Sequence, residues 1–259
     1  MFDSPKGNLL DNNRFQAWEK SIICFSEYHT GWILSVICLA ALAIRFAYWI
    51  QDPVLPRDSI YYLHMLDDFS RNGDNSPGSF PPIPLWIWAS MKRNNLAPEY
   101  YGRLLNIVSD TFLILIVFKI CRHLTQKKFF CLLAGAMIAV HPELVELSTS
   151  LLRESLMLLF LALSILIFLQ YFKKLSIIAL VGASFYAGTA FLCRYEAGEF
   201  LFWLVAGVWL LKWRRHIKLT LLLLHVIIGG CSFVLTIVAW ELFMRLPIDY
   251  CLRGLLWRL

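Results

Sequence analysis

Charged residues are scarce in this chain. Only 16% of its 259 residues are Asp, Glu, Lys or Arg, whereas 59% are hydrophobic. Soluble domains contain roughly 45–50% apolar residues, and a soluble core could not hide this much apolar surface. The composition therefore excludes an ordinary soluble domain and predicts an integral membrane protein.

Several motifs that would indicate other classes are also missing. The seven cysteines form no CxxC pair and no metal-type spacing with histidine, so we interpret them as membrane-packed thiols. The net charge of +6 comes from short basic clusters between apolar runs, which is not the pattern of a nucleic-acid-binding face. Residues 1–30 show no cleavage pattern after a short apolar core, so we expect no removable signal peptide.

Long apolar runs make up most of the chain. A membrane-spanning helix needs about 20 mostly apolar residues, and six segments are clear candidates, with a shorter seventh at 129–140. The segments are 31–50, 104–121, 129–140, 152–172, 175–193, 199–212 and 219–243. We predict an all-α integral membrane fold, a polytopic bundle of about seven transmembrane helices that forms a single membrane domain over residues 1–259.

The basic clusters predict how this bundle is oriented. If 129–140 crosses the membrane, the clusters within 119–128, 173–174 and 212–218 all lie on one side, which the positive-inside rule makes cytoplasmic. Residues 1–30 then form a cytoplasmic N-terminal segment of a multi-pass protein in the cell membrane. The loop 51–103 is extracytoplasmic, and residues 104–259 hold the remaining helices.

The loop 51–103 contains two predicted helices. Residues 59–70 place apolar groups at helical spacing, with Asp67 and Asp68 opposite, as in an amphipathic helix at the membrane interface. After a turn-rich stretch, Pro81 and Pro82 begin a second, aromatic-rich helix. We therefore expect this loop to be folded and to form part of a functional site, rather than to be a flexible connection between two spans.

Ionisable residues gather at the predicted outer ends of the helices. Because charges near bilayer depth are costly unless they are paired or functional, we predict a polar cavity that opens outward. An interfacial salt bridge or helix-end charge is an equally good interpretation of any one residue. The groups are Arg57 and Asp58; His141, Glu143, Glu146, Arg153 and Glu154; and Arg194, Tyr195, Glu196 and Glu199.

Arg45 and Asp110 are two of the ionisable residues that fall inside predicted spans. Asp110 is treated as a helix-packing hydrogen-bond partner, although an acid within a span is a functional hypothesis by default. Arg45 lies near the outer end of the first span, where its long side chain can snorkel to the interface, and a structural role is the alternative.

A series of short motifs resembles a known family. The motifs are Pro56-Arg57-Asp58-Ser59-Ile60-Tyr61-Tyr62, Phe80-Pro81-Pro82-Ile83-Pro84-Leu85, Tyr101-Gly102-Arg103-Leu104-Leu105-Asn106, His141-Pro142-Glu143-Leu144, Leu152-Arg153-Glu154-Ser155 and Arg194-Tyr195-Glu196-Ala197. In this order they resemble the GT-C glycosyltransferases, and more narrowly the bacterial relatives of dolichyl-phosphate-mannose protein mannosyltransferase and of the lipid A aminoarabinose transferases. The resemblance covers about residues 30–215.

The resemblance implies a glycosyltransferase of the hexosyltransferase type that takes a sugar from a polyprenyl-phosphate donor. The transfer would take place at the extracytoplasmic face, to a glycan, lipid or protein acceptor. Asp58 occupies the position of the general base, which would take the proton of the acceptor hydroxyl. Arg153 and Arg194 are candidates for phosphate contacts, with pairing to Glu154 and Glu196 as the alternative.

The rest of the predicted substrate-binding set is less specific. Tyr61 and Tyr62 would line a sugar pocket or anchor the interface, and His141 would bind substrate or serve structurally. The full set is Arg57, Tyr61, Tyr62, His141, Glu143, Arg153, Glu154, Arg194 and Glu196. No cofactor is assigned, because Ser59 follows Asp58 where the family often has a second acid, which leaves a divalent-metal site unsupported.

Two other functions remain open at this point. The chain ends at Leu259, soon after the seventh predicted span, so a truncated or inactive GT-C-like scaffold is one alternative, with a membrane-protein partner supplying the C-terminal region. The other is a transporter, which would need paired broken half-helices. Gly229-Gly230 is the only comparable break, and it has no counterpart earlier in the chain.

Overall fold

The computed structural model describes residues 25, 27–52, 54–72, 81–215, 219–244, 246 and 250. Within these residues all regular secondary structure is helical. The helices are α2 (Thr30–Gln51), α3 (Arg57–Asn72), α4 (Pro82–Arg93), α5 (Pro98–Leu124), α6 (Lys128–Val140), α7 (Pro142–Thr149), α8 (Glu154–Lys174), α9 (Ile177–Cys193), the 3₁₀ helix η2 (Tyr195–Gly198), α10 (Glu199–Arg215) and α11 (Leu219–Phe243). The predicted turn after residue 72, the cytoplasmic assignment of residues 1–24, and the thiols Cys24 and Cys251 lie outside the described residues.

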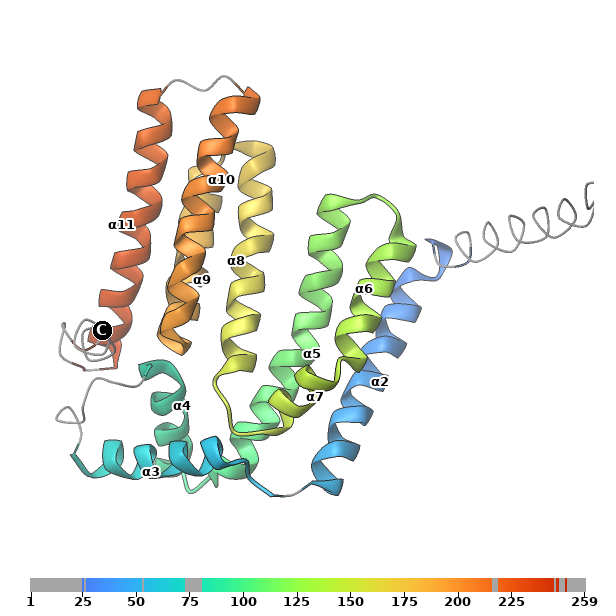
Figure 1. Ribbon diagram of the computed structural model, residues 1–259, viewed down its shortest axis with the longest axis vertical. Coiled ribbons are helices and arrows are strands. Elements are labelled where there is room, and N and C mark those ends of the chain that lie inside the picture. The colour runs from blue at the N-terminus through green and yellow to red at the C-terminus, as the bar shows by residue number, and fades with distance from the viewer. Residues whose placement is uncertain are drawn as a thin grey trace, which may run out of the picture.

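The long helices stand side by side in two groups (Figure 1). The first group packs α2, α5 and α6 together, and the second packs α8 with α9 and α11, with α10 beside them. Contacts between α5 and α8 join the two groups. Helix α3 lies across one end of the bundle, next to α4, so the segment predicted as a folded loop caps that end.

Four described helices, α2, α5, α8 and α11, are long and apolar enough to cross a membrane. The bent pair of α6 and α7 makes a fifth if the two count as one span, and α9 is apolar but has only 17 residues. Large apolar side chains on these helices face outward, with Leu39 65% exposed and Leu235 65% exposed. Apolar surfaces of this extent are unfavourable in water and are expected to face lipid. Because several helices carry them, the chain is a multi-pass membrane protein. Each of the seven predicted spans contains a helix, and the count of seven crossings stays a prediction.

Proline sets the start of three helices. Pro82, Pro98 and Pro142 each stand in the first turn of α4, α5 and α7, where a missing N–H costs nothing because no helical acceptor is available there. At Pro142 the same property breaks a longer helix, since the residue before a proline avoids helical backbone angles. His141 is extended, with φ −63° and ψ 119°, and α6 and α7 meet at a bend of 54°.

A buried ion pair fastens the first group of helices. Arg45 on α2 donates from Nε to Asp110 Oδ2 on α5 at 2.8 Å, and its Nη1 donates to the carbonyl of Ala139 on α6 at 2.9 Å. Neither charged side chain is exposed by more than 1%. The expected packing role of Asp110 is therefore confirmed. Of the two roles open to Arg45, the structure shows the structural one, because this guanidinium binds its partners inside the bundle and does not snorkel to the interface.

The second group packs through small residues. On α9, Ala183, Ala187 and Ala190 are fully buried, which lets the neighbouring backbones approach closely. A Cβ added at Gly188 would lie 3.0 Å from Cβ of Thr236 and 3.2 Å from the Phe233 carbonyl oxygen on α11. A side chain at this position would therefore require Thr236 or the α11 backbone to shift by a few tenths of an ångström.

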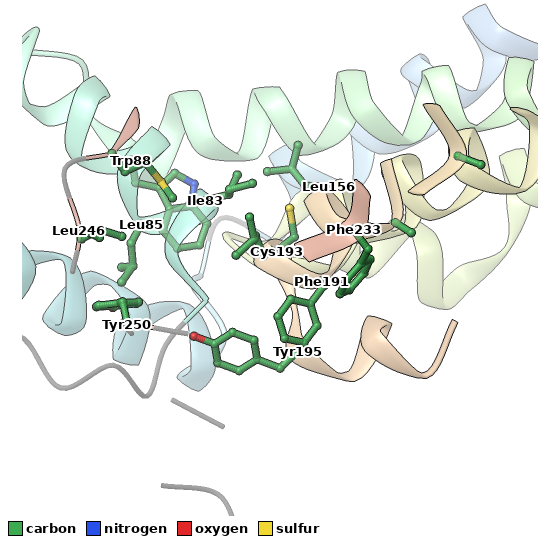
Figure 2. Packing of buried hydrophobic residues seen from close by; sticks show 14 of the residues in the cluster. Ile83, Leu85, Trp88, Leu156, Phe191, Cys193, Tyr195, Phe233, Leu246 and Tyr250 are labelled. Atoms are coloured by element: carbon green, nitrogen blue, oxygen red, sulfur yellow. The ribbon is translucent and has the colours of Figure 1, made fainter. Parts of the chain in front are cut away.

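The main apolar core lies where α4 meets the second group. Ile83, Leu85 and Trp88 of α4 approach Leu156 of α8, Phe191 and Cys193 of α9, and Tyr195 (Figure 2). Trp88 has no exposed surface, and Cys193 is a buried free thiol, as the composition predicted. The core holds α4 against the bundle, and Tyr62 and Leu66 of α3 belong to the same core.

Candidate active site

The site begins on the first two turns of α3. Asp58 lies in the first turn, where the positive end of the helix dipole favours a carboxylate, and its side chain is exposed. Tyr62 follows four residues later and therefore lies on the same face of the helix. In contrast to Asp58, Tyr62 is only 7% exposed.

Tyr62 is held between an aromatic ring and a cation. The Trp88 ring of α4 stacks on it, with centroids 6.0 Å apart and planes at 26°. The guanidinium carbon of Arg153 lies 5.7 Å from the centre of the Tyr62 ring, within the range of a cation–π contact. Tyr62 thus connects α3 to the residue that precedes α8.

Arg153 and Glu154 meet Arg194 at the start of α8. Arg194 Nη1 lies 2.8 Å from Glu154 Oε1, and Arg194 Nε lies 3.3 Å from Glu196 Oε2. Arg153 Nε lies 4.0 Å from the same Glu154 oxygen. Glu154 therefore bridges two guanidinium groups, with its side chain only 14% exposed.

The electrostatics of Tyr62 connect Asp58 to this cluster. Burial raises the pKa of the Tyr62 hydroxyl, Arg153 opposes that shift, and Glu154 and Asp58 add to it. The charge of Arg194 acts on the same hydroxyl. One tyrosine is thus within electrostatic reach of a carboxylate from α3 and of both arginines. We call Asp58, Tyr62, Arg153, Glu154, Arg194 and Glu196 the arginine cluster.

Two residues of α5 support the segment that carries Arg153. The Asn106 amide nitrogen donates to the carbonyls of Ser150 and Leu152, at 2.8 and 2.7 Å. One turn earlier, a Cβ on Gly102 would overlap Leu151 Cδ1 and lie 3.1 Å from Trp88 Nε1. The chain between α7 and α8 therefore passes close to α5, and Asn106 satisfies two of its buried carbonyls.

The structure brings six of the ten predicted site residues together in the arginine cluster. Arg57 and Tyr61 lie beside it on α3 with exposed side chains, and the Tyr61 and Tyr62 rings are 6.1 Å apart. His141 and Glu143 are exposed at the bend between α6 and α7. Among the described residues, no hydrogen bond or ion pair joins these last two to the arginines. The ion pairs that the sequence offered as the alternative to phosphate contacts are present, since Arg153 pairs with Glu154 and Arg194 pairs with Glu154 and Glu196.

The motif reading missed two supporting residues. Trp88 and Asn106 touch the arginine cluster or the segment that holds it, yet neither was predicted as a site residue. Asn106 stands four residues after Gly102, so the two lie on one face of α5. A polar residue one turn after a glycine on the same face could have indicated a close contact with another segment. Trp88 had no such signal, because its contact with Tyr62 depends on how α3 and α4 fold together.

Within the described part of the chain, no three His, Cys, Asp or Glu side chains are grouped as metal ligands. The polar chemistry of the site therefore consists of one exposed carboxylate, one buried phenol and two guanidinium groups held by two further carboxylates. In this combination the Asp58 carboxylate can accept a proton, and the guanidinium groups of Arg153 and Arg194 can bind an anion.

Two comparisons with known proteins bear on this site. A model of the dolichyl-phosphate-mannose-protein mannosyltransferase family matches residues 79–240, which is more than half of the chain. The match includes α4, α5, Arg153, Glu154 and Arg194, whereas Asp58 and Tyr62 precede it. No curated protein matches the chain.

Proposed function

Because this chain belongs to the dolichyl-phosphate-mannose-protein mannosyltransferase family, we propose that it transfers a sugar from a polyprenyl-phosphate donor to an acceptor at the extracytoplasmic face of the membrane. The observation that carries the proposal is the arginine cluster, in which Arg153 lies over the Tyr62 ring, Glu154 bridges Arg153 and Arg194, and the charge of Asp58 acts on the Tyr62 hydroxyl.

Asp58 is the proposed general base. The acceptor hydroxyl gives its proton to the Asp58 carboxylate as its oxygen attacks the anomeric carbon of the sugar. The bond between that carbon and the phosphate oxygen breaks, and the lipid phosphate leaves with the electron pair. Asp58 suits this role because its exposed carboxylate is open to a hydroxyl from outside the bundle.

Arg194 and Arg153 are the proposed phosphate ligands. Guanidinium groups stay charged at any working pH and bind phosphate oxygens in pairs, which would stabilise the charge on the leaving group. The ion pairs of Arg194 use its Nε and Nη1, out of five N–H donors. Glu154 and Glu196 would therefore hold the guanidinium in place while another of its edges meets the phosphate.

The other predicted substrate-binding residues have less support. Arg57 and Tyr61 are exposed next to Asp58 and are proposed to contact the sugar or the acceptor. His141 and Glu143 lie at the α6–α7 bend and are proposed to contribute only if a bound substrate extends to that bend. We further propose that α3 and α4 lie at the outer interface of a bundle with seven crossings.

The proposal is tested by transfer of radiolabelled sugar from a set of polyprenyl-phosphate donors, using purified protein reconstituted in liposomes. Asp58→Asn keeps the shape of the side chain and removes its basicity, so we expect transfer to fall by at least about a hundredfold, the range of general-base catalysis. Asp68→Asn is the matched control, because it removes an exposed carboxylate from the same helix.

The transfer activities of wild type and the two variants distinguish an active enzyme from an inactive scaffold and test the role of Asp58. Wild-type transfer that is lost in a folded Asp58→Asn protein and kept in Asp68→Asn would support the proposed base. Transfer that survives Asp58→Asn would assign the base elsewhere. Inactivity of wild type and variants with every donor would favour a catalytically inactive GT-C-like subunit.

A further inference from the structure

A second polar region lies at the far end of α8 from the arginine cluster. A cavity of about 680 Å³ is lined there by residues of α5, α8 and α9. Glu154 starts α8 and Lys174 ends it, and a helix of 21 residues is about 30 Å long. The cavity is therefore separated from the proposed transfer site by the thickness of a bilayer core.

The rim of this cavity is basic. Lys173 and Lys174 from the last turn of α8 line it with His123 from the last turn of α5, and none of the described residues in the lining is acidic. The charge of Lys173 acts on the His123 imidazole, so these groups are close together. Ser176, the residue that precedes α9, also lines the cavity and adds a hydroxyl.

The wall of the cavity is apolar and faces outward. Ile167 of α8 lies opposite Gly182 of α9, where an added Cβ would meet Ile167 Cγ2 at 3.5 Å. Ile178 on the first turn of α9 also lines the cavity and is 85% exposed. The cavity thus combines a cationic rim with a hydrocarbon wall that follows α8 and α9 into the bundle.

From this combination we infer that the cavity binds an anionic phospholipid. The phosphate of its headgroup would lie against Lys173, Lys174 and His123, and an acyl chain would lie along Ile167 and Ile178. A soluble anion would not need the apolar wall, and a neutral lipid would not need the cationic rim. Basic pockets between transmembrane helices on the cytoplasmic side, where the sequence places these lysines, commonly recognise anionic lipid headgroups. The inference does not depend on the proposed sugar transfer.

The test is native mass spectrometry of the purified chain with phosphatidylglycerol and with phosphatidylcholine of the same acyl chains. We expect one phosphatidylglycerol to bind in preference to phosphatidylcholine. Each lysine near an anionic headgroup contributes a factor of about five, so Lys173→Gln combined with Lys174→Gln should reduce the preference about thirtyfold. Lys119→Gln combined with Lys127→Gln is the matched control. It removes the same charge from exposed positions at this end of the bundle, outside the cavity lining.

Three results of this comparison would overturn the inference, and a fourth comes from competition with phosphate. These are equal binding of the two lipids by wild type, a preference that survives the variant at Lys173 and Lys174, or an equal loss in the control variant. Displacement of the lipid by millimolar inorganic phosphate would also contradict it, because the site would then be an anion site without a role for the apolar wall. Asp58→Asn should leave the lipid preference unchanged, which separates this inference from the proposed function.

Discussion

At the scale of single residues, the pair of Arg45 and Asp110 shows what sequence reasoning can and cannot supply. An acid within a span predicts a packing contact, and such a contact is present. The partner was not predictable, because it lies 65 residues away on another helix and has no spacing rule. The arginine cluster is similar, since the motifs predicted its charged members but not the stacking of Trp88 on Tyr62.

The first prediction at this scale concerns the buried pair. Asp110→Ala would leave the Arg45 guanidinium buried among three helices without its carboxylate. Removing one partner of a buried ion pair costs about 3–5 kcal/mol of unfolding free energy. The measurement is reversible unfolding in mixed micelles with increasing sodium dodecyl sulfate, followed by circular dichroism.

A double variant separates charge from packing in this case. Arg45→Met combined with Asp110→Leu removes both charges and keeps side chains of similar size, so much of the lost stability should return. Asp68→Ala is the control, because the Asp68 side chain is exposed. If Asp110→Ala is as stable as the control, the pair does not contribute to the fold in the way that its burial indicates.

At the scale of elements, helix starts were more predictable than helix breaks. Proline at the start of α4 follows a local rule that the sequence displays directly. The same residue type at Pro142 divides an apolar stretch into α6 and α7, and the sequence reading placed only a helix end there. Whether a proline starts one helix or bends a pair depends on what the next turn packs against, and α7 packs against α2 and α5.

The contact between α9 and α11 gives a prediction at this scale. Gly188→Ala places a Cβ 3.0 Å from Cβ of Thr236, so Thr236 or the α11 backbone must shift, which should cost about 1–3 kcal/mol as an overpacked core does. Gly230→Ala is a matched control on α11, since nothing lies within 4 Å of its added Cβ. Alanine is also the better helix former by about 1 kcal/mol, so the control should be neutral or stabilising.

Thermal unfolding of the two glycine variants in the same detergent provides the measurement. A lower Tm for Gly188→Ala than for Gly230→Ala is the expected order. Equal values would mean that α9 and α11 move apart at little cost, and the small residues on α9 would then not set the distance between the helices.

At the scale of the whole molecule, hydropathy predicted the helices but not their arrangement. The length of each apolar run is enough to predict a spanning helix. The predicted segment 219–243, for example, coincides with α11. The division into two groups joined by α5 and α8 depends on side-chain fit between distant segments, which periodicity does not encode. The position of α3 across one end of the bundle, next to α4, likewise required the structure.

The number of crossings is the last prediction, and it depends on α6 and α7. With 13 residues, α6 is about 20 Å long, short of a hydrocarbon core of about 30 Å, and the eight residues of α7 continue at a bend of 54°. If the pair crosses, the turn before α6 and the end of α8 lie on the same side of the membrane. If it does not, they lie on opposite sides.

Single cysteines on a background without the seven native ones distinguish these cases. We place them at Gln126, Lys174 and Asn95, all of which are exposed, and label intact and permeabilised cells with a membrane-impermeant maleimide. The expected result is labelling of Asn95→Cys in intact cells and of Gln126→Cys and Lys174→Cys only after permeabilisation. Gln126→Cys and Lys174→Cys accessible from opposite sides would show that α6 and α7 do not cross, because only α8 would then separate the two positions. Reversed labelling of all three would keep that crossing and invert the orientation, which would place the arginine cluster on the cytoplasmic side and exclude transfer at the outer face.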